Sequence, residues 1–190
     1  MSEKKKIAIF ASGSGSNFEA IAKACLNNRI NAEVALCVCD KPGAYVTQRA
    51  KNLNIPVLEI KQKSYGSKSE FESVILDELN KHGVEFICLA GYMRIVGDVL
   101  LNKFQGRIIN IHPSLLPAFP GVDAIGQALD YGVKVFGVTV HYVDSTLDGG
   151  KIISQAAIPY DGNDREEIEP MVHANEHKLY VETVSKLLEA

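Results

Sequence analysis

The segment KIAIFASGSGSNFEAIAKACLN, residues 6–27, joins an apolar run to a helical pattern through a turn of glycine and serine. Lys6–Ala11 is apolar on both faces, as strands in the middle of a parallel sheet usually are. Ser16–Asn27 has the apolar spacing of a helix. A strand, a glycine-rich turn and a helix in this order predict the first unit of an alternating α/β sheet.

The same alternation continues to the C-terminus. Further strands are predicted at Glu33–Cys39, Val57–Ile60, Glu85–Ala90, Arg107–Ile111, Lys134–Tyr142 and Lys151–Ile158. Further helices are predicted at Ala44–Leu53, Lys68–His82, Gly97–Phe104, Ala124–Tyr131 and Asp164–Leu188. The pattern indicates an α/β fold, a doubly wound and mostly parallel sheet with helices on both faces. Because no helix separates the last two strands, we expect an antiparallel edge near the C-terminus.

The final predicted helix carries two local signals. Asp164 and Glu167 have the spacing of a capping box, which predicts the start of the helix. Pro170 should kink this helix or delay its start, because proline lacks the backbone N–H and clashes with the preceding turn.

The bulk composition indicates one globular domain, spanning residues 1–190. Apolar residues make up 46% of the 190 residues and charged residues 23%, a normal mix for a folded chain. The formal net charge of −3 and a pI near 6.0 give no reason to expect nucleic acid or a membrane as partner. Ile7–Ala11 is too short for the core of a signal peptide, so we predict a cytoplasmic location. Both a monomer and a homodimer fit the sequence.

The cysteines do not have the spacing of a metal or redox site, which usually includes Cys-x-x-Cys. Cys37 and Cys39 are two residues apart in a predicted strand and therefore face the same side. We expect the full set to be buried, reduced thiols: Cys25, Cys37, Cys39 and Cys88.

The turn Ser12–Asn17 predicts a phosphate site. Its glycines let the backbone approach a ligand, and the start of the following helix offers free N–H groups and the positive end of the helix dipole. A dinucleotide fingerprint would need glycine where Phe18 stands. Asp40 occupies the place of the ribose carboxylate of such a site, so that alternative is weakened but stays open. No Gly-Lys-Ser/Thr follows, which argues against a P-loop.

The segment NIHPSLLP, residues 110–117, carries the strongest catalytic signal. Asn110 and His112 are two residues apart at the end of a predicted strand, so they share a face, and Pro113 keeps His112 extended. An amide beside an imidazolium can stabilise an oxyanion, each donor being worth roughly 3 kcal/mol in the transition state. In the turn Leu147–Gly150, paired glycines allow Asp148 to point inward, where it would favour the charged form of His112. Taken alone, an Asp-Gly turn is more often a surface turn than an inward one.

These segments together resemble the phosphoribosylglycinamide formyltransferases, the folate-dependent enzymes of purine synthesis. The resemblance rests on Ser12–Asn17, Gly91–Ile95, Asn110–Pro117 and Leu147–Gly150, in the order of the family, and covers about Lys6 to Leu187. It implies transfer of a formyl group from 10-formyltetrahydrofolate to the amine of glycinamide ribonucleotide. No metal is implied.

The resemblance also implies residue roles. The catalytic group would be Asn110, His112 and Asp148, with the first two holding a tetrahedral oxyanion and the third keeping His112 charged. Substrate contacts would come from Gly15, Ser16, Asn17 and Glu176. The folate site would be formed by Lys68, Met93, Arg94, Ile95, Val96, Asn110, Val143, Asp144 and Ser145. A surface lysine is an equally good interpretation of Lys68. Asp123 and Ile125 stand where some members have histidines, so no role of those histidines is carried over.

Three alternatives stay open. His173-Ala-Asn-Glu176-His177 matches the His-x-x-Glu-His motif of zinc hydrolases. Histidines four residues apart on a helix share a face, so the two could bind Zn²⁺ together. A formyltetrahydrofolate deformylase would use the same Asn110–Pro117 segment but transfer the formyl group to water. A nucleotide-binding protein without catalysis would use the glycine-rich turn alone.

Overall fold

The computed structural model describes residues 4–189. Within this range the chain forms one seven-stranded sheet in the order β3-β2-β1-β4-β5-β6-β7. The strands are β1 (Lys5–Ala11), β2 (Ala32–Cys39), β3 (Val57–Glu59), β4 (Phe86–Leu89), β5 (Ile108–His112), β6 (Val135–Tyr142) and β7 (Ile152–Pro159). The helices are α1 (Ser16–Leu26), α2 (Tyr45–Asn52), the 3₁₀ turn η1 (Gln62–Ser64), α3 (Lys68–Lys81), α4 (Asp98–Lys103), α5 (Ala124–Tyr131) and α6 (Arg165–Glu189).

The topology confirms the predicted doubly wound sheet. β1 to β5 are all parallel, whereas β6 is antiparallel to β5, and β7 to β6. From β1 the chain first builds outward through β2 and β3, and then returns to build β4 and β5 on the other side. In such sheets ligands bind beyond the carboxyl ends of the strands, where the order reverses. The turn after β1 and the loop after β4 both start at this point.

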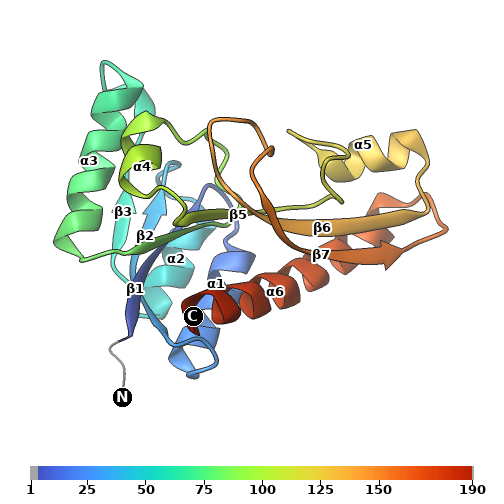
Figure 1. Ribbon diagram of the computed structural model, residues 1–190, viewed down its shortest axis with the longest axis horizontal. Helices are drawn as coiled ribbons and strands as arrows, with labels where there is room; N and C mark the ends of the chain where they lie inside the picture. Colours follow the sequence, from blue (N-terminus) through green and yellow to red (C-terminus); the bar gives the residue numbers. More distant parts are fainter. Residues whose placement is uncertain (1–3, 190) are drawn as a thin grey trace.

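Helices cover both faces of the sheet (Figure 1), and the apolar strands pack against them on both sides. Ile7, Ile9 and Ala11 of β1 pack into one core with α1, α2 and α6. Ala8 and Phe10 point to the opposite face and pack with α3 and α4. This period of two is the reason why β1 lacks a polar face. A third core joins β6 and β7 to α5 and α6. Among residues 4–189 no helix combines the length and apolar character needed to span a bilayer.

The predicted elements are all present, and their ends differ from the prediction by at most one residue. Two features of α6 correct it. The helix begins at Arg165 and continues through Pro170, so of the two predicted effects of the proline, a kink or a delayed start, the delayed start does not occur. The capping box is incomplete: Asp164 Oδ1 accepts from Glu166 N at 2.8 Å, while the carboxylate of Glu167 accepts from the Tyr160 hydroxyl instead.

The predicted buried thiols are also confirmed, because the four cysteines of the chain are free and buried. Cys37 and Cys39 lie in the same core, as their spacing predicts. Burial raises the pKa of Cys25 and of Cys37 to about 12, which leaves both thiols protonated and unreactive at neutral pH.

Candidate active site

The backbone conformation of the glycine-rich turn requires glycine at position 15. Gly15 is the N-cap of α1 and has a φ of 76°, a region that side chains strongly disfavour. A Cβ at this position would also lie 2.4 Å from Val46 Cγ2 and 2.9 Å from Val46 Cα. Because the N-cap is glycine, no side chain satisfies the first amides of α1. These N–H groups are therefore available to an anion.

Glu176 connects α6 to this turn. Its Oε2 accepts from Asn17 Nδ2 at 3.3 Å and faces His173 Nδ1 at 2.8 Å. The hydrogen bond to Glu176 raises the pKa of His173, so its charged form balances the buried carboxylate. One turn further along α6, the Tyr180 hydroxyl donates to Leu89 O at 2.7 Å. Tyr180 thereby fixes the helix over the strand ends and positions Glu176 beside α1.

The neighbourhood of Glu176 holds two buried polar atoms that lack a hydrogen-bond partner within residues 4–189, Asn17 Oδ1 and His177 Nε2. Unpaired buried polar atoms are uncommon and call for a ligand or water. In the described range, no three histidine, cysteine, aspartate or glutamate side chains are grouped as metal ligands would be. Within the motif His173–His177, Glu176 is the residue that contacts the glycine-rich turn, through Asn17.

The predicted catalytic residues Asn110, His112 and Asp148 gather at the carboxyl end of β5. His112 Nδ1 lies 3.5 Å from Asp148 Oδ2, and both side chains are about nine-tenths buried. His112 Nε2 donates to Phe119 O at 2.8 Å. Of the two predicted oxyanion donors, His112 is therefore already bonded to a carbonyl of the protein. His112 can donate to a substrate carbonyl only if that carbonyl takes the place of Phe119 O. Hydrogen bonds of this kind often rearrange when substrate binds.

The turn that carries Asp148 also depends on glycine. Asp148 itself has a positive φ of 49°. A Cβ on Gly150 would lie 1.8 Å from Tyr142 O, so no other residue fits there. Gly121 N donates to Asp148 Oδ2 at 2.8 Å, which fixes the carboxylate against the loop that follows β5. The paired glycines therefore turn Asp148 inward, as the sequence predicts.

His141 belongs to this cluster, and the sequence analysis missed it. It pairs with Asn110 across the antiparallel β5–β6 register. Its Nε2 lies 3.2 Å from Asn110 Nδ2 and 3.8 Å from Asp148 Oδ1, while Nδ1 faces Tyr142 O at 2.8 Å. A neutral ring with its proton on Nδ1 can accept from Asn110 and so orient the amide. The available signal was Thr139 and His141, two polar residues on one face of an apolar strand.

We expect the pKa of His141 to lie below 6.5 in the folded protein, because burial lowers it. Since the unfolded chain then binds more protons, the contribution of His141 to stability is complete above about pH 6.5 and is lost as the pH falls. Nuclear magnetic resonance titration of the ring proton, assigned with His141→Gln, measures this directly. A midpoint at or above 6.5 would contradict the assignment of a neutral ring.

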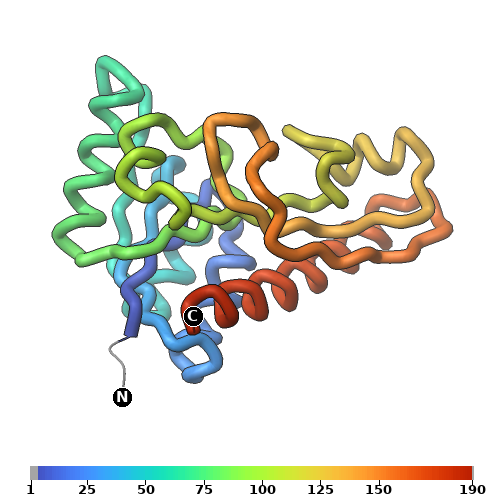
Figure 2. The backbone as a smooth tube through the Cα atoms, viewed as in Figure 1, coloured from blue at the N-terminus to red at the C-terminus, as the bar shows by residue number. Residues whose placement is uncertain are grey.

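The residues predicted to line the folate site fall on two adjacent loops. Met93 and Ile95 are about 60% or more exposed, whereas the side chain of Val96 is buried in the core with α3 and α4. Val143 packs against the same core, so the loop after β6 lies beside the loop after β4 (Figure 2). Asp144 and Ser145 are exposed. Because the side chain of Val96 is buried, only its backbone is available to a ligand.

Lys68 and Arg94 differ in their surroundings. Lys68 is exposed at the start of α3. Its Cε lies close to Gly97, because a Cβ added to Gly97 would be 2.8 Å away from it. The Arg94 side chain is one-third exposed, and its Nε lies 2.6 Å from Asp40 Oδ2. The ion pair with Asp40 thus holds the guanidinium of Arg94, which belongs to the loop that follows β4.

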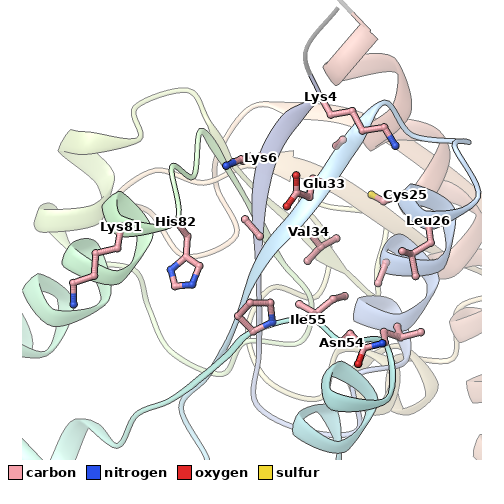
Figure 3. Close-up of a pocket in the computed structure, with 15 residues that line it drawn as sticks. Lys4, Lys6, Cys25, Leu26, Glu33, Val34, Asn54, Ile55, Lys81 and His82 are labelled. Carbon is pink, nitrogen blue, oxygen red and sulfur yellow. The ribbon is translucent and has the colours of Figure 1, made fainter. Parts of the chain in front are cut away.

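A cavity of about 560 Å³ lies at the opposite edge of the sheet, around the amino-terminal ends of β1 and β2. Figure 3 shows Glu33 and Val34 of β2 in its wall, with Lys6 and His82 to one side and Ile55 below. None of the predicted site residues lines this cavity. The polar clusters described above therefore do not extend into it.

The chain is similar to known proteins in sequence and in fold. Residues 5–184 match the family model described as Formyl transferase. Phosphoribosylglycinamide formyltransferase of Bacillus subtilis (strain 168) is 54% identical over 185 residues, which are 97% of this chain and 95% of that protein. Trifunctional purine biosynthetic protein adenosine-3 of Drosophila melanogaster is 37% identical over 97% of this chain, which spans 14% of that protein. The crystal structure of glycinamide ribonucleotide transformylase 1 from Geobacillus kaustophilus has a TM-score of 0.95 and 50% identity, covering 97% of this chain and 99% of that one. The chain belongs to the phosphoribosylglycinamide formyltransferases, within the wider formyl transferase family.

Proposed function

We propose that this protein transfers the formyl group of 10-formyltetrahydrofolate to the amine of N1-(5-phosphoribosyl)glycinamide, in de novo purine biosynthesis. Asn110, His112 and Asp148 are the catalytic residues in this proposal. The observation that carries it is the 3.5 Å separation of His112 Nδ1 and Asp148 Oδ2 in a chain of this family. Family membership argues against the zinc-hydrolase alternative.

The proposed reaction proceeds through a tetrahedral intermediate. The substrate amine attacks the formyl carbon, a C–N bond forms, and the carbonyl oxygen becomes an oxyanion. Asn110 directs one amide hydrogen to His141, which leaves the second for the oxyanion. A protonated His112 adds a second donor, and Asp148 stabilises its charge. Collapse breaks the bond to folate N10, and the proton that the amine loses passes to N10 with the Asp148 carboxylate assisting the transfer.

The phosphate and ribose contacts are proposed for the glycine-rich turn and α6. The free amides at the start of α1 suit the phosphate, with Gly15 letting it approach and Ser16 adding a hydroxyl. Glu176 and the unpaired Asn17 Oδ1 are acceptors, so they suit the hydroxyl groups of a ribose. An anion site beside hydrogen-bond acceptors is what a sugar phosphate requires.

The folate is proposed to lie between the loops after β4 and β6. Met93, Ile95 and Leu147 are exposed apolar side chains there, which suits the aromatic rings of a folate. Asn110 and the backbone of Val96 and Val143–Ser145 lie at the same edge of the sheet. Lys68 and Arg94 supply positive charge toward its glutamate end. We also propose a cytoplasmic location, which the reduced cysteines support.

An absorbance assay with 10-formyltetrahydrofolate and the ribonucleotide tests the proposal. The wild type should lose formyl-folate only when the amine substrate is present, whereas a deformylase would release formate without it. Asp148→Asn keeps the shape of the side chain but removes its charge, and should lower kcat by about 100-fold with little change in KM. Asp77→Asn, an exposed site on α3, is the matched control. Wild-type kcat in Asp148→Asn would remove the carboxylate from the chemistry.

A further inference from the structure

Asp40 is a buried carboxylate that the reaction scheme leaves without a role. It follows β2 at the carboxyl edge of the sheet and is 2% exposed. Its Oδ1 accepts a short hydrogen bond from the Ser12 hydroxyl, and its Oδ2 lies 2.6 Å from Arg94 Nε. Both oxygens are therefore engaged by protein groups, and at this depth of burial the carboxylate is poorly placed to bind the ribose of a dinucleotide. A charge this deeply buried persists only when it is paired.

Ser12 extends this contact into a bridge between two loops. Its single hydroxyl hydrogen goes to Asp40, so the oxygen is free to accept from Met93 N at 2.8 Å. Its backbone N donates to Gly91 O at 3.1 Å. Ser12 opens the glycine-rich turn, whereas Gly91–Val96 is the loop that follows β4. The carboxylate of Asp40 thus determines how the hydroxyl of Ser12 is oriented toward Met93.

The second arm of the bridge is the ion pair with Arg94. Arg94 also donates from Nη1 to Gln62 Oε1 at 2.6 Å, so its guanidinium is held on two sides. Met93 and Arg94 are consecutive, and both depend on Asp40, one through Ser12 and one directly. The glycine-rich turn has further anchors, because Val46 N donates to Gly13 O at 3.1 Å and Arg49 Nε to Ser14 O at 2.8 Å.

We infer that Asp40 is a positioning residue: through Ser12 and Arg94 it fixes the loop after β4, and with it the folate subsite, at a set distance from the phosphate turn. The inference rests on the proposed function for the identity of the two ligands. A loop that is already fixed loses less conformational freedom when folate binds, so loss of Asp40 should weaken folate binding and leave kcat nearly unchanged. Because the turn has its own anchors, loss of Asp40 affects the folate side.

Asp40→Asn tests this, because it preserves size while removing the charge. The KM for 10-formyltetrahydrofolate should rise by about tenfold, while the KM for the ribonucleotide and the kcat stay within about threefold. Amide hydrogen exchange in a peptide covering residues 91–96 should accelerate by about tenfold. Asp77→Asn, which is exposed on α3, should change none of these. A merely structural role would lower thermal stability without separating the two KM values.

The exchange measurement keeps the inference separate from the proposed function. A wild type without formyl transfer refutes the function, and exchange in residues 91–96 still decides whether Asp40 holds the loop. Unchanged exchange in Asp40→Asn overturns the inference, as does an equal rise in both KM values. If Asp40→Asn does not fold, Ser12→Ala decides in its place, since it keeps the ion pair with Arg94 and removes the hydroxyl that joins Asp40 to Met93 N.

Discussion

Replacement of His112 by alanine is expected to lower kcat by about 1000-fold, the largest loss of any substitution in the site. The imidazole has two tasks in the proposed reaction, since it donates to the oxyanion and pairs with Asp148, the carboxylate that assists the proton transfer. Asp148 lies 3.5 Å from Nδ1, so removing the ring also leaves a buried carboxylate with one partner fewer. Asn110 remains, and its amide accounts for the residual rate. Steady-state kinetics with both substrates at saturation measures the effect.

His82→Ala is the matched control for this experiment. His82 also bonds a backbone carbonyl, with Nδ1 2.9 Å from Glu78 O, but it is less deeply buried than His112 and lines the cavity at the opposite edge of the sheet. Its kcat should stay within about twofold of the wild type. A His112→Ala protein that melts as the wild type does, yet retains kcat within tenfold, would refute the catalytic role.

Most of the fold could be predicted because its signals are local. Each parallel strand is a short apolar run bounded by a turn, and Lys6–Ala11 shows this without reference to the rest of the chain. The family resemblance, carried by Ser12–Asn17 and Asn110–Pro117, is likewise confirmed by the matches to known proteins. The course of α6 through Pro170 could not be predicted in the same way. There the packing of the helix against β6, β7 and α1 overrides a local preference.

The parts of the site that escaped prediction depend on pairing between distant strands. His141 faces Asn110 only because β6 pairs with β5 in one particular antiparallel register, and a shift by one residue would turn it to the other face. Asp40 resembled a ribose ligand because its neighbours across the sheet were unknown. Its contacts with Ser12 and Arg94 join segments that are 28 and 54 residues away. The roles predicted for Asn110, His112 and Asp148 remain predictions until they are measured.

Gly15→Ala is expected to weaken ribonucleotide binding by 10-fold to 100-fold, about the value of one or two charge-assisted hydrogen bonds to the phosphate. The substitution is unfavourable in two ways. Alanine must adopt a φ of 76°, and its Cβ would meet Val46 at 2.4 Å from Cγ2. The contact with Val46 Cα, at 2.9 Å, involves backbone, so a change of side-chain rotamer cannot relieve it. The turn must therefore move away from α2, and the amides at the start of α1 move with it.

The same strain should lower the free energy of unfolding by about 2–4 kcal/mol, which chemical denaturation measures. Gly13→Ala separates this strain from a general intolerance of the turn, because a Cβ on Gly13 meets nothing within 4 Å. That control should leave both the KM for the ribonucleotide and the stability nearly unchanged. The KM for 10-formyltetrahydrofolate should also stay constant in Gly15→Ala, because the folate loop is held by Ser12 and Asp40. An equal loss in the two glycine variants would mean that the shape of the whole turn, and not the left-handed backbone at Gly15, governs phosphate binding.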